Sequence, residues 1–310
     1  MFLQFELWKN CSFGCAFCFN RDIIKKQSKL KRMTEIINHL NSEEADNYDE
    51  FGIMGGEIFN NELDTSELKQ DFYKLIDVMI DKLKTGKAKR CLICTSMMYS
   101  NNSHFLEFCN YINKNIVDDQ FLICTSFDLI GRFNYTKLHN WKHNVKALHD
   151  LYPRIPLHVE MIMTEVLLKS VIDGKFNPKK FEKKYKCRID YMVPVTGYSN
   201  EQITKQEFND KILSGFFPKR ETLLQFLSYV YTNGIFSKVD LENFINIKNH
   251  SDRSYFGNGD DEWELMDNRH DTEDKVHHYM CKPNTSGYID SEVHPREDVE
   301  DFLKMIEGQY

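Results

Sequence analysis

The stretch CSFGCAFCFN, residues 11–20, follows a short apolar segment and places Cys11, Cys15 and Cys18 at the spacing C-x-x-x-C-x-x-C. A loop this short can direct three thiolates at one metal centre, but it supplies no fourth ligand. Thiolates favour zinc, copper(I) or iron–sulfur clusters, and cubane clusters usually take four of them. The spacing therefore predicts a metal centre with one position left open for a small molecule.

A second motif, FGIMGGE at residues 51–57, lies one strand–helix–strand unit further along the chain. Gly55 and Gly56 end an apolar run, where glycine lets a ligand approach the backbone closely. Glu57 can accept a hydrogen bond from an ammonium group. An ordinary strand-to-helix turn would also account for the two glycines.

Together these motifs resemble those of the radical S-adenosylmethionine (AdoMet) enzymes. The resemblance implies that Cys11, Cys15 and Cys18 hold a [4Fe–4S] cluster, whose fourth iron is chelated by the amino and carboxylate groups of AdoMet. One electron, from a donor such as flavodoxin or ferredoxin, then breaks a carbon–sulfur bond. The resulting 5′-deoxyadenosyl radical takes a hydrogen atom from the substrate, and such an enzyme is oxygen-sensitive.

The same resemblance assigns residues to AdoMet. Gly55, Gly56 and Glu57 would carry its amino group, and Phe17, just before the third cysteine, is counted with the cofactor-binding residues. Family members often have proline after the glutamate. Ile58 stands there in this chain, so the turn after the motif is expected to differ.

A weaker resemblance covers the segment from Cys124 to Arg132, where many family members contact the ribose and carboxylate of AdoMet. It assigns Ser126 and Asp128 to the ribose and Arg132 to the carboxylate. A hydroxyl and a carboxylate can bind ribose hydroxyls, and the guanidinium fork matches a carboxylate. An Asp helix N-cap and a surface arginine would fit the same residues.

Strand-like and helix-like segments alternate up to Gly197. Strands are expected at residues 2–7, 51–54, 91–96, 121–127, 157–163 and 189–195, with helices at 33–40, 68–83, 104–112, 138–148 and near Phe181. This order predicts an α/β fold with a parallel sheet whose strand carboxyl ends gather ligands. The family's fold, a six-stranded (β/α)6 partial TIM barrel, has the same number of strands.

We expect two parts: a barrel core at residues 1–197 and a helical, loop-rich extension at 198–310 that closes the barrel mouth. Helices are expected at residues 221–231 and 299–306, with an acidic, glycine-containing segment at 251–274 between them. Cys281 follows His277 and His278. It could bind zinc with a histidine, reach the barrel mouth, or simply be a buried cysteine. The extension lacks the four cysteines of a usual auxiliary cluster.

The alternation of polar and apolar side chains along a strand predicts which residues face the barrel lumen, because successive side chains point to opposite faces of a sheet. On the first strand Glu6 alternates with apolar neighbours, and on the fifth His158 and Glu160 do so. These three are our catalytic candidates, since a lumen carboxylate or imidazole can bind substrate or move a proton. A hydrogen-bonded structural role would explain each of them as well. Cys91 and Cys94, in the third strand, are expected to point to opposite faces because they lie three residues apart, and both are expected to pack in the core rather than bind a second metal.

Composition agrees with a cytoplasmic enzyme. No run approaches the length of a membrane span, and nine cysteines without framework spacing suit a reducing compartment. The net charge of −7 argues against a broad nucleic-acid-binding surface.

Several functions stay open. The acidic balance favours a small-molecule substrate that is nucleotide- or nucleoside-like, and the loop ending Cys18-Phe19 is similar to that of viperin-type nucleotide dehydratases. The alternative substrate is a peptide or protein side chain, or a nucleic-acid base. A remote alternative is a binding module in which a distant fourth ligand completes a structural zinc site.

Overall fold

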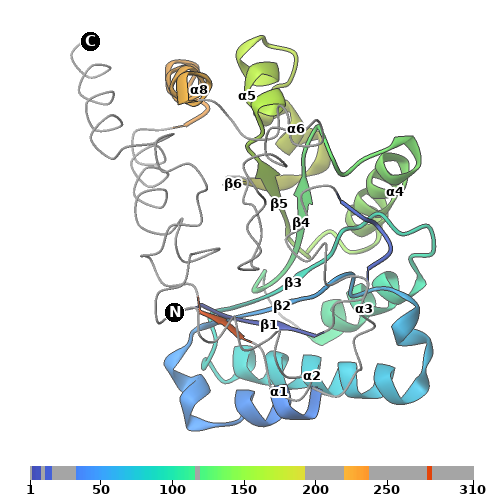
Figure 1. Cartoon of the computed structure of the whole chain (residues 1–310). Coiled ribbons are helices and arrows are strands. Elements are labelled where there is room, and N and C mark those ends of the chain that lie inside the picture. Colours follow the sequence, from blue (N-terminus) through green and yellow to red (C-terminus); the bar gives the residue numbers. More distant parts are fainter. Residues whose placement is uncertain are drawn as a thin grey trace, which may run out of the picture.

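The computed structural model describes residues 2–7, 11–15, 33–115, 119–192, 220–236 and 278–280. Six parallel strands form one open sheet, and each lies beside the strand that follows it in the sequence (Figure 1). They are β1 (Phe2–Glu6), β2 (Glu50–Met54), β3 (Arg90–Cys94), β4 (Phe121–Phe127), β5 (Leu157–Ile162) and β6 (Cys187–Met192). The predicted six-stranded parallel sheet of a partial barrel is confirmed.

Helices connect the strands, as the alternation predicted. They are α1 (Met33–Leu40), α2 (Ser66–Lys84), α3 (Ser103–Asn115), α4 (Tyr135–Leu151), α5 (Glu165–Ile172) and α6 (Pro178–Tyr185), with 3-10 turns η1 (Glu43–Asn47) and η2 (Asn61–Asp64). Between β5 and β6 there are two helices, where we expected one. The Thr164 hydroxyl caps the additional helix, α5, by accepting a hydrogen bond from the Leu167 N–H at 3.1 Å.

The extension contributes both a helix and a strand. Helix α8 (Arg220–Thr232) corresponds to the helix predicted at 221–231, and it packs on α5, where Thr222 Oγ1 donates to Glu165 Oε1 at 2.8 Å. Strand β7 (His278–Met280) pairs antiparallel with the free edge of β1. Helix α8 agrees with the predicted helical, loop-rich extension, and the short strand β7 was not predicted. Residues 251–274 and 299–306, and Cys281 with His277, lie outside the described residues.

The main core lies between the sheet and its helices. Leu3 and Phe5 of β1 are fully buried, as are Phe72 and Ile76 on the apolar face of α2. The Cys91 thiol of β3 lies 3.8 Å from the Met79 carbonyl oxygen of α2, which identifies the helix-covered face of the sheet. We call the opposite face of the sheet the inner face.

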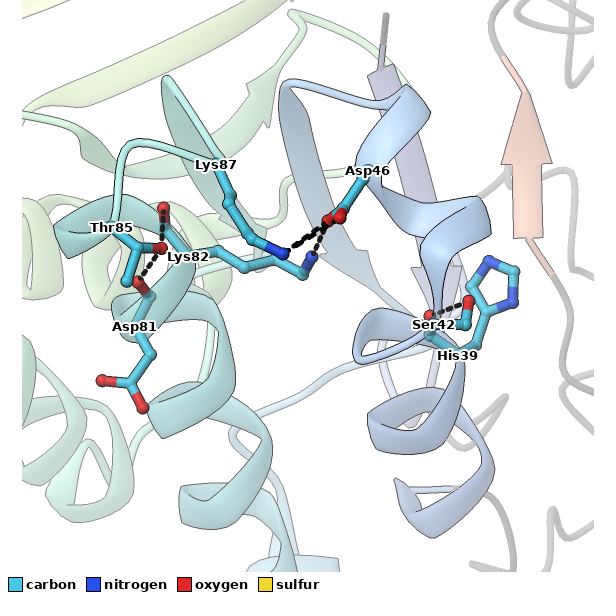
Figure 2. Close-up of polar contacts among 7 residues, drawn as sticks. All are labelled: His39, Ser42, Asp46, Asp81, Lys82, Thr85 and Lys87. Atoms are coloured by element: carbon cyan, nitrogen blue, oxygen red, sulfur yellow. Dashed lines mark hydrogen bonds and ion pairs between the residues drawn. The ribbon is translucent and has the colours of Figure 1, made fainter.

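The amino ends of the strands are held by ion pairs. Asp46 of η1 accepts hydrogen bonds from Lys82 at 3.3 Å and Lys87 at 2.9 Å, as Figure 2 shows. The Lys82 side chain is only 7% exposed, and its ammonium also lies over the Phe51 ring. The two hydrogen bonds lower the pKa of Asp46. These contacts join the segment before β2 to the segment before β3, at the end of the sheet away from the two motifs.

Among the residues described, no helix is long and apolar enough to cross a membrane.

Candidate functional site

The cysteine loop and the Gly-Gly-Glu segment leave neighbouring strands at the same edge of the sheet. β1 and β2 pair in parallel, and the Leu7 N–H donates to the Met54 carbonyl oxygen at 2.9 Å, which extends the pairing to the last residues of both strands. Residues 11–15 follow the first strand and residues 55–57 follow the second. The two motifs therefore start side by side, although about forty residues separate them in the chain.

The part of the cysteine loop that is described contains two of the three predicted ligands. Cys11 is partly exposed, Cys15 is 8% exposed, and neither forms a disulfide. Two thiols on one short loop fit a thiolate-ligated metal centre. Cys18 and Phe17 lie outside the described residues, so their roles stay predictions.

Gly55 and Gly56 are both partly exposed at the end of β2. Neither has a positive φ, in contrast to Gly14 of the cysteine loop at 57°. Backbone conformation therefore does not require glycine at these two positions. Residues without side chains let a ligand approach the main chain closely, and the binding of AdoMet at these two glycines stays a prediction.

Glu57 has a structural role that the sequence did not suggest. Its carboxylate is 2% exposed and accepts hydrogen bonds from the Phe59 N–H at 3.0 Å, the Thr95 hydroxyl at 2.7 Å and the Ser96 N–H at 2.8 Å. The Ser96 hydroxyl also donates to it. Four donors match the acceptor capacity of a carboxylate. Glu57 thus fixes the carboxyl end of β3 beside that of β2, and its predicted contact with the AdoMet ammonium stays a prediction.

The segment after β3 forms a third part of this edge, which sequence reasoning missed. Met97 has a φ of 56°, unusual for a residue with a side chain. The fully buried Asn144 of α4 holds this turn by donating to the carbonyl oxygens of Met97 at 3.0 Å and Tyr99 at 2.9 Å. The sequence analysis placed Thr95 and Ser96 inside the third strand, whereas that strand ends at Cys94.

Ser126, Asp128 and Arg132 lie together at the end of β4. Arg132 donates to the Ser126 carbonyl oxygen at 3.1 Å and its hydroxyl at 3.4 Å, and its Nε lies 3.6 Å from Asp128 Oδ2. Asp128 is 1% exposed and accepts a hydrogen bond from the Ile130 N–H at 2.8 Å. Burial raises the pKa of Asp128 to about 6, against the opposing charge of Arg132 and hydrogen bonds from the main chain. These contacts bring the predicted trio together, while its assignment to AdoMet stays a prediction.

The lumen candidates of β5 face the inner side of the sheet, as predicted. Val159 and Met161 are fully buried against the helices, whereas His158 and Glu160 are partly exposed on the other face. Glu160 pairs in register with Ser126 of β4 and Asp190 of β6. Burial, followed by the negative charge of Asp190, raises the pKa of Glu160 to about 7.

Asp190, which the sequence analysis did not nominate, is the partner of His158. The His158 Nδ1 lies 3.1 Å from Asp190 Oδ2. Burial alone would raise the pKa of Asp190, but the hydrogen bond from His158 and the charges of His158, Arg188 and Arg90 outweigh it and lower the pKa. Two neighbouring carboxyl groups thus titrate in different ranges, an arrangement typical of acid–base sites.

Glu6 occupies the last position of β1, where its backbone pairs with that of Met54. Its side chain lies outside the described atoms, so its place in the lumen stays a prediction.

A pair of thiols lies on the inner face beside these carboxyl groups. Cys94 and Cys124 are register partners in β3 and β4, and Gln4 Nε2 lies 3.6 Å from Cys94 Sγ. Contact with the Cys94 thiol, together with burial, raises the pKa of Cys124. Core packing was therefore correct for Cys91 but wrong for Cys94, which is partly exposed on the inner face. Residues three apart in a strand face opposite ways.

Comparisons with known proteins identify similar structures but no similar sequence. No family model matches, and neither does any curated protein. Among solved structures, native anSMEcpe with bound AdoMet is similar at a TM-score of 0.48 and 13% identity, over 79% of this chain and 61% of that one. The same protein with AdoMet and the Cp18Cys peptide gives 0.49 and 13%, over the same shares. HydG, a maturase of the [FeFe]-hydrogenase, gives 0.33 and 14%, over 100% and 82%.

The chain thus spans about three fifths of the length of anSMEcpe.

Proposed function

We propose that this chain is a radical AdoMet enzyme. The observation that carries the proposal is the placement of residues 11–15 and 55–57 at the carboxyl ends of paired parallel strands. Cys11, Cys15 and Cys18 would hold a [4Fe–4S] cluster, and the backbone of Gly55 and Gly56 would bind AdoMet. The bound group would supply a 5′-deoxyadenosyl radical that abstracts a hydrogen atom from the substrate.

The chain's own side chains would then bind and orient the substrate on the inner face. Glu160 has a pKa of about 7 and can hold or release a proton at its carboxyl group near neutral pH. The neighbouring Asp190 keeps a lowered pKa and stays ionised, since His158 donates to it. When Glu160 holds its proton, the two residues provide one neutral donor and one anionic acceptor at adjacent positions of β5 and β6.

This pairing supports a small substrate with hydroxyl or amino groups, such as a nucleoside or nucleotide. The carboxyl groups accept hydrogen bonds from such groups, and the Ser126 hydroxyl at the register position beside Glu160 can donate or accept. Anaerobic binding measurements with AdoMet present, comparing nucleosides, nucleotides and short peptides, would test the class. Binding of peptides alone would contradict the nucleoside proposal.

The proposed chemistry is tested by anaerobic reconstitution with iron and sulfide. The brown protein should absorb near about 400 nm, as thiolate-ligated iron–sulfur clusters do, and after reduction with AdoMet it should yield 5′-deoxyadenosine by mass spectrometry. Alanine at Cys11, Cys15 or Cys18 should abolish both signals. The matched control is Cys187→Ala, at a partly exposed free cysteine on β6, and it should retain them. A colourless protein that binds zinc would overturn the proposal.

A further inference from the structure

A lysine from α4 contacts the main chain of the cysteine loop. Lys137 Nζ donates to the Phe13 carbonyl oxygen at 2.5 Å, across 124 residues of sequence. Phe13 lies between Cys11 and Cys15, and Figure 1 shows their dark blue segment beside α4. The contact therefore fixes the chain between two predicted metal ligands.

The loop around this contact is open. Ser12 and Gly14, on either side of Phe13, are both exposed. Gly14 has a φ of 57°, and a Cβ added there would meet nothing within 4 Å. The Phe13 ring packs on the main core, and Cys15 is buried. The Phe13 carbonyl lies in the chain between the Phe13 and Cys15 side chains. A charged hydrogen bond from Lys137 to it would restrict the backbone that sets the direction of the Cys11 and Cys15 thiols.

The charge of Lys137 lies against the loop between two of the predicted cluster ligands. Within the described part of the chain, no ion pair joins Lys137 to a carboxylate. The first turn of α4 contains no acidic residue, and Asn134 caps it by accepting from the Lys137 N–H at 2.8 Å. The nearby Arg132 is different, because its charge faces Asp128 at 3.6 Å. Lys137 and the start of α4 therefore form a net positive boundary of the loop.

We propose that Lys137 is a positioning residue of the cysteine loop and that its charge raises the reduction potential of the cluster bound there. The inference rests on the proposed function. A reduced cluster carries one more negative charge than an oxidised one, so a fixed nearby cation stabilises the reduced form more.

Three variants separate the hydrogen bond from the charge. Lys137→Arg keeps both, Lys137→Gln keeps a donor without the charge, and Lys137→Met removes both. The control is Lys142→Met, at an exposed lysine on the same helix. Two properties are measured: amide hydrogen exchange of residues 11–15 in the metal-free protein, and the midpoint potential of the reconstituted cluster by titration followed by electron paramagnetic resonance.

In the metal-free protein, Lys137→Met should speed exchange of residues 11–15 about tenfold, equivalent to about 1.4 kcal/mol. Lys137→Arg and the control should exchange like the parent, and Lys137→Gln should lie closer to the parent than to Lys137→Met. Unchanged exchange in Lys137→Met would overturn the positioning role. This measurement needs no cluster, so it tests the contact even if the proposed function fails.

In the reconstituted protein, Lys137→Gln and Lys137→Met should both shift the midpoint potential to more negative values, while Lys137→Arg and Lys142→Met keep that of the parent. A merely structural contact would leave the potential of Lys137→Gln unchanged, and that result would overturn the electrostatic role. A parent protein that binds no iron would refute the proposed function and the electrostatic role together.

Discussion

Replacing Glu57 by alanine should destabilise the fold before any cofactor is present. The substitution removes the acceptor of four hydrogen bonds, two of them from the main-chain N–H groups of Phe59 and Ser96. A buried donor left without a partner costs about 1–3 kcal/mol, whereas the Thr95 and Ser96 hydroxyls can rotate toward other acceptors. We therefore expect the free energy of unfolding to fall by about 3–5 kcal/mol.

The assay is urea unfolding of the metal-free protein, followed by far-ultraviolet circular dichroism. Glu57→Gln keeps one carboxamide oxygen as an acceptor and should lose about 1–3 kcal/mol. Glu67→Gln, at an exposed glutamate in the first turn of α2, is the control and should stay within about 0.5 kcal/mol of the parent. A loss below about 1 kcal/mol for Glu57→Ala would refute the structural role derived from these hydrogen bonds.

The cofactor role of Glu57 needs a separate measurement. In the reconstituted protein, Glu57→Gln should weaken AdoMet binding while the iron content stays that of the parent. Parent-like AdoMet affinity in this variant, measured by equilibrium binding, would contradict the assignment made from the Gly-Gly-Glu motif.

Further predictions concern three other parts of the molecule. The pKa of Glu160 in the folded protein, about 7, lies above the ordinary glutamate value of 4.5, so its contribution to stability is lost as the pH rises from 4.5 through 7. Relative to the parent, Glu160→Gln should gain about 3 kcal/mol of stability between pH 4.5 and 8 in urea unfolding; a stability difference that stays the same over this pH range would contradict the raised pKa of Glu160. Asn144→Ala should lower the free energy of unfolding by about 2–4 kcal/mol, because the Met97 turn loses its buried donor; parent-like stability would show that the turn holds without it. Lys82→Met should be tolerated better than Asp46→Ala in thermal unfolding, because removal of Asp46 leaves the Lys82 ammonium buried without that partner, and the reverse order would refute this account.

The strands and their faces could be predicted from the sequence because both follow from local rules. The alternation of His158 and Glu160 with Leu157, Val159 and Met161 assigned the two faces of β5 correctly, since side chains of a strand alternate whatever its neighbours are. The same rule placed Cys94 on the opposite face of the strand from Cys91. Burial was assumed for both, although only Cys91 lies against α2.

Other features depended on contacts between distant segments. α5 was missed because its eight residues form a short helix whose stability depends on tertiary contacts, including that of Glu165 with Thr222 of α8. Strand β7 has three residues, and its existence is set by the free edge of β1. A local sequence pattern therefore predicts neither α5 nor β7.

The cysteine spacing and the Gly-Gly-Glu motif alone determined the chemistry that we propose, because ligand type and spacing limit which metal centre a short loop can hold. Only the tertiary structure decided that Glu57 holds the end of β3, that Asp190 partners His158 and that Lys137 reaches Phe13. Each of these contacts joins residues far apart in the chain, and side-chain hydrogen bonds of that kind have no sequence period by which they could be found.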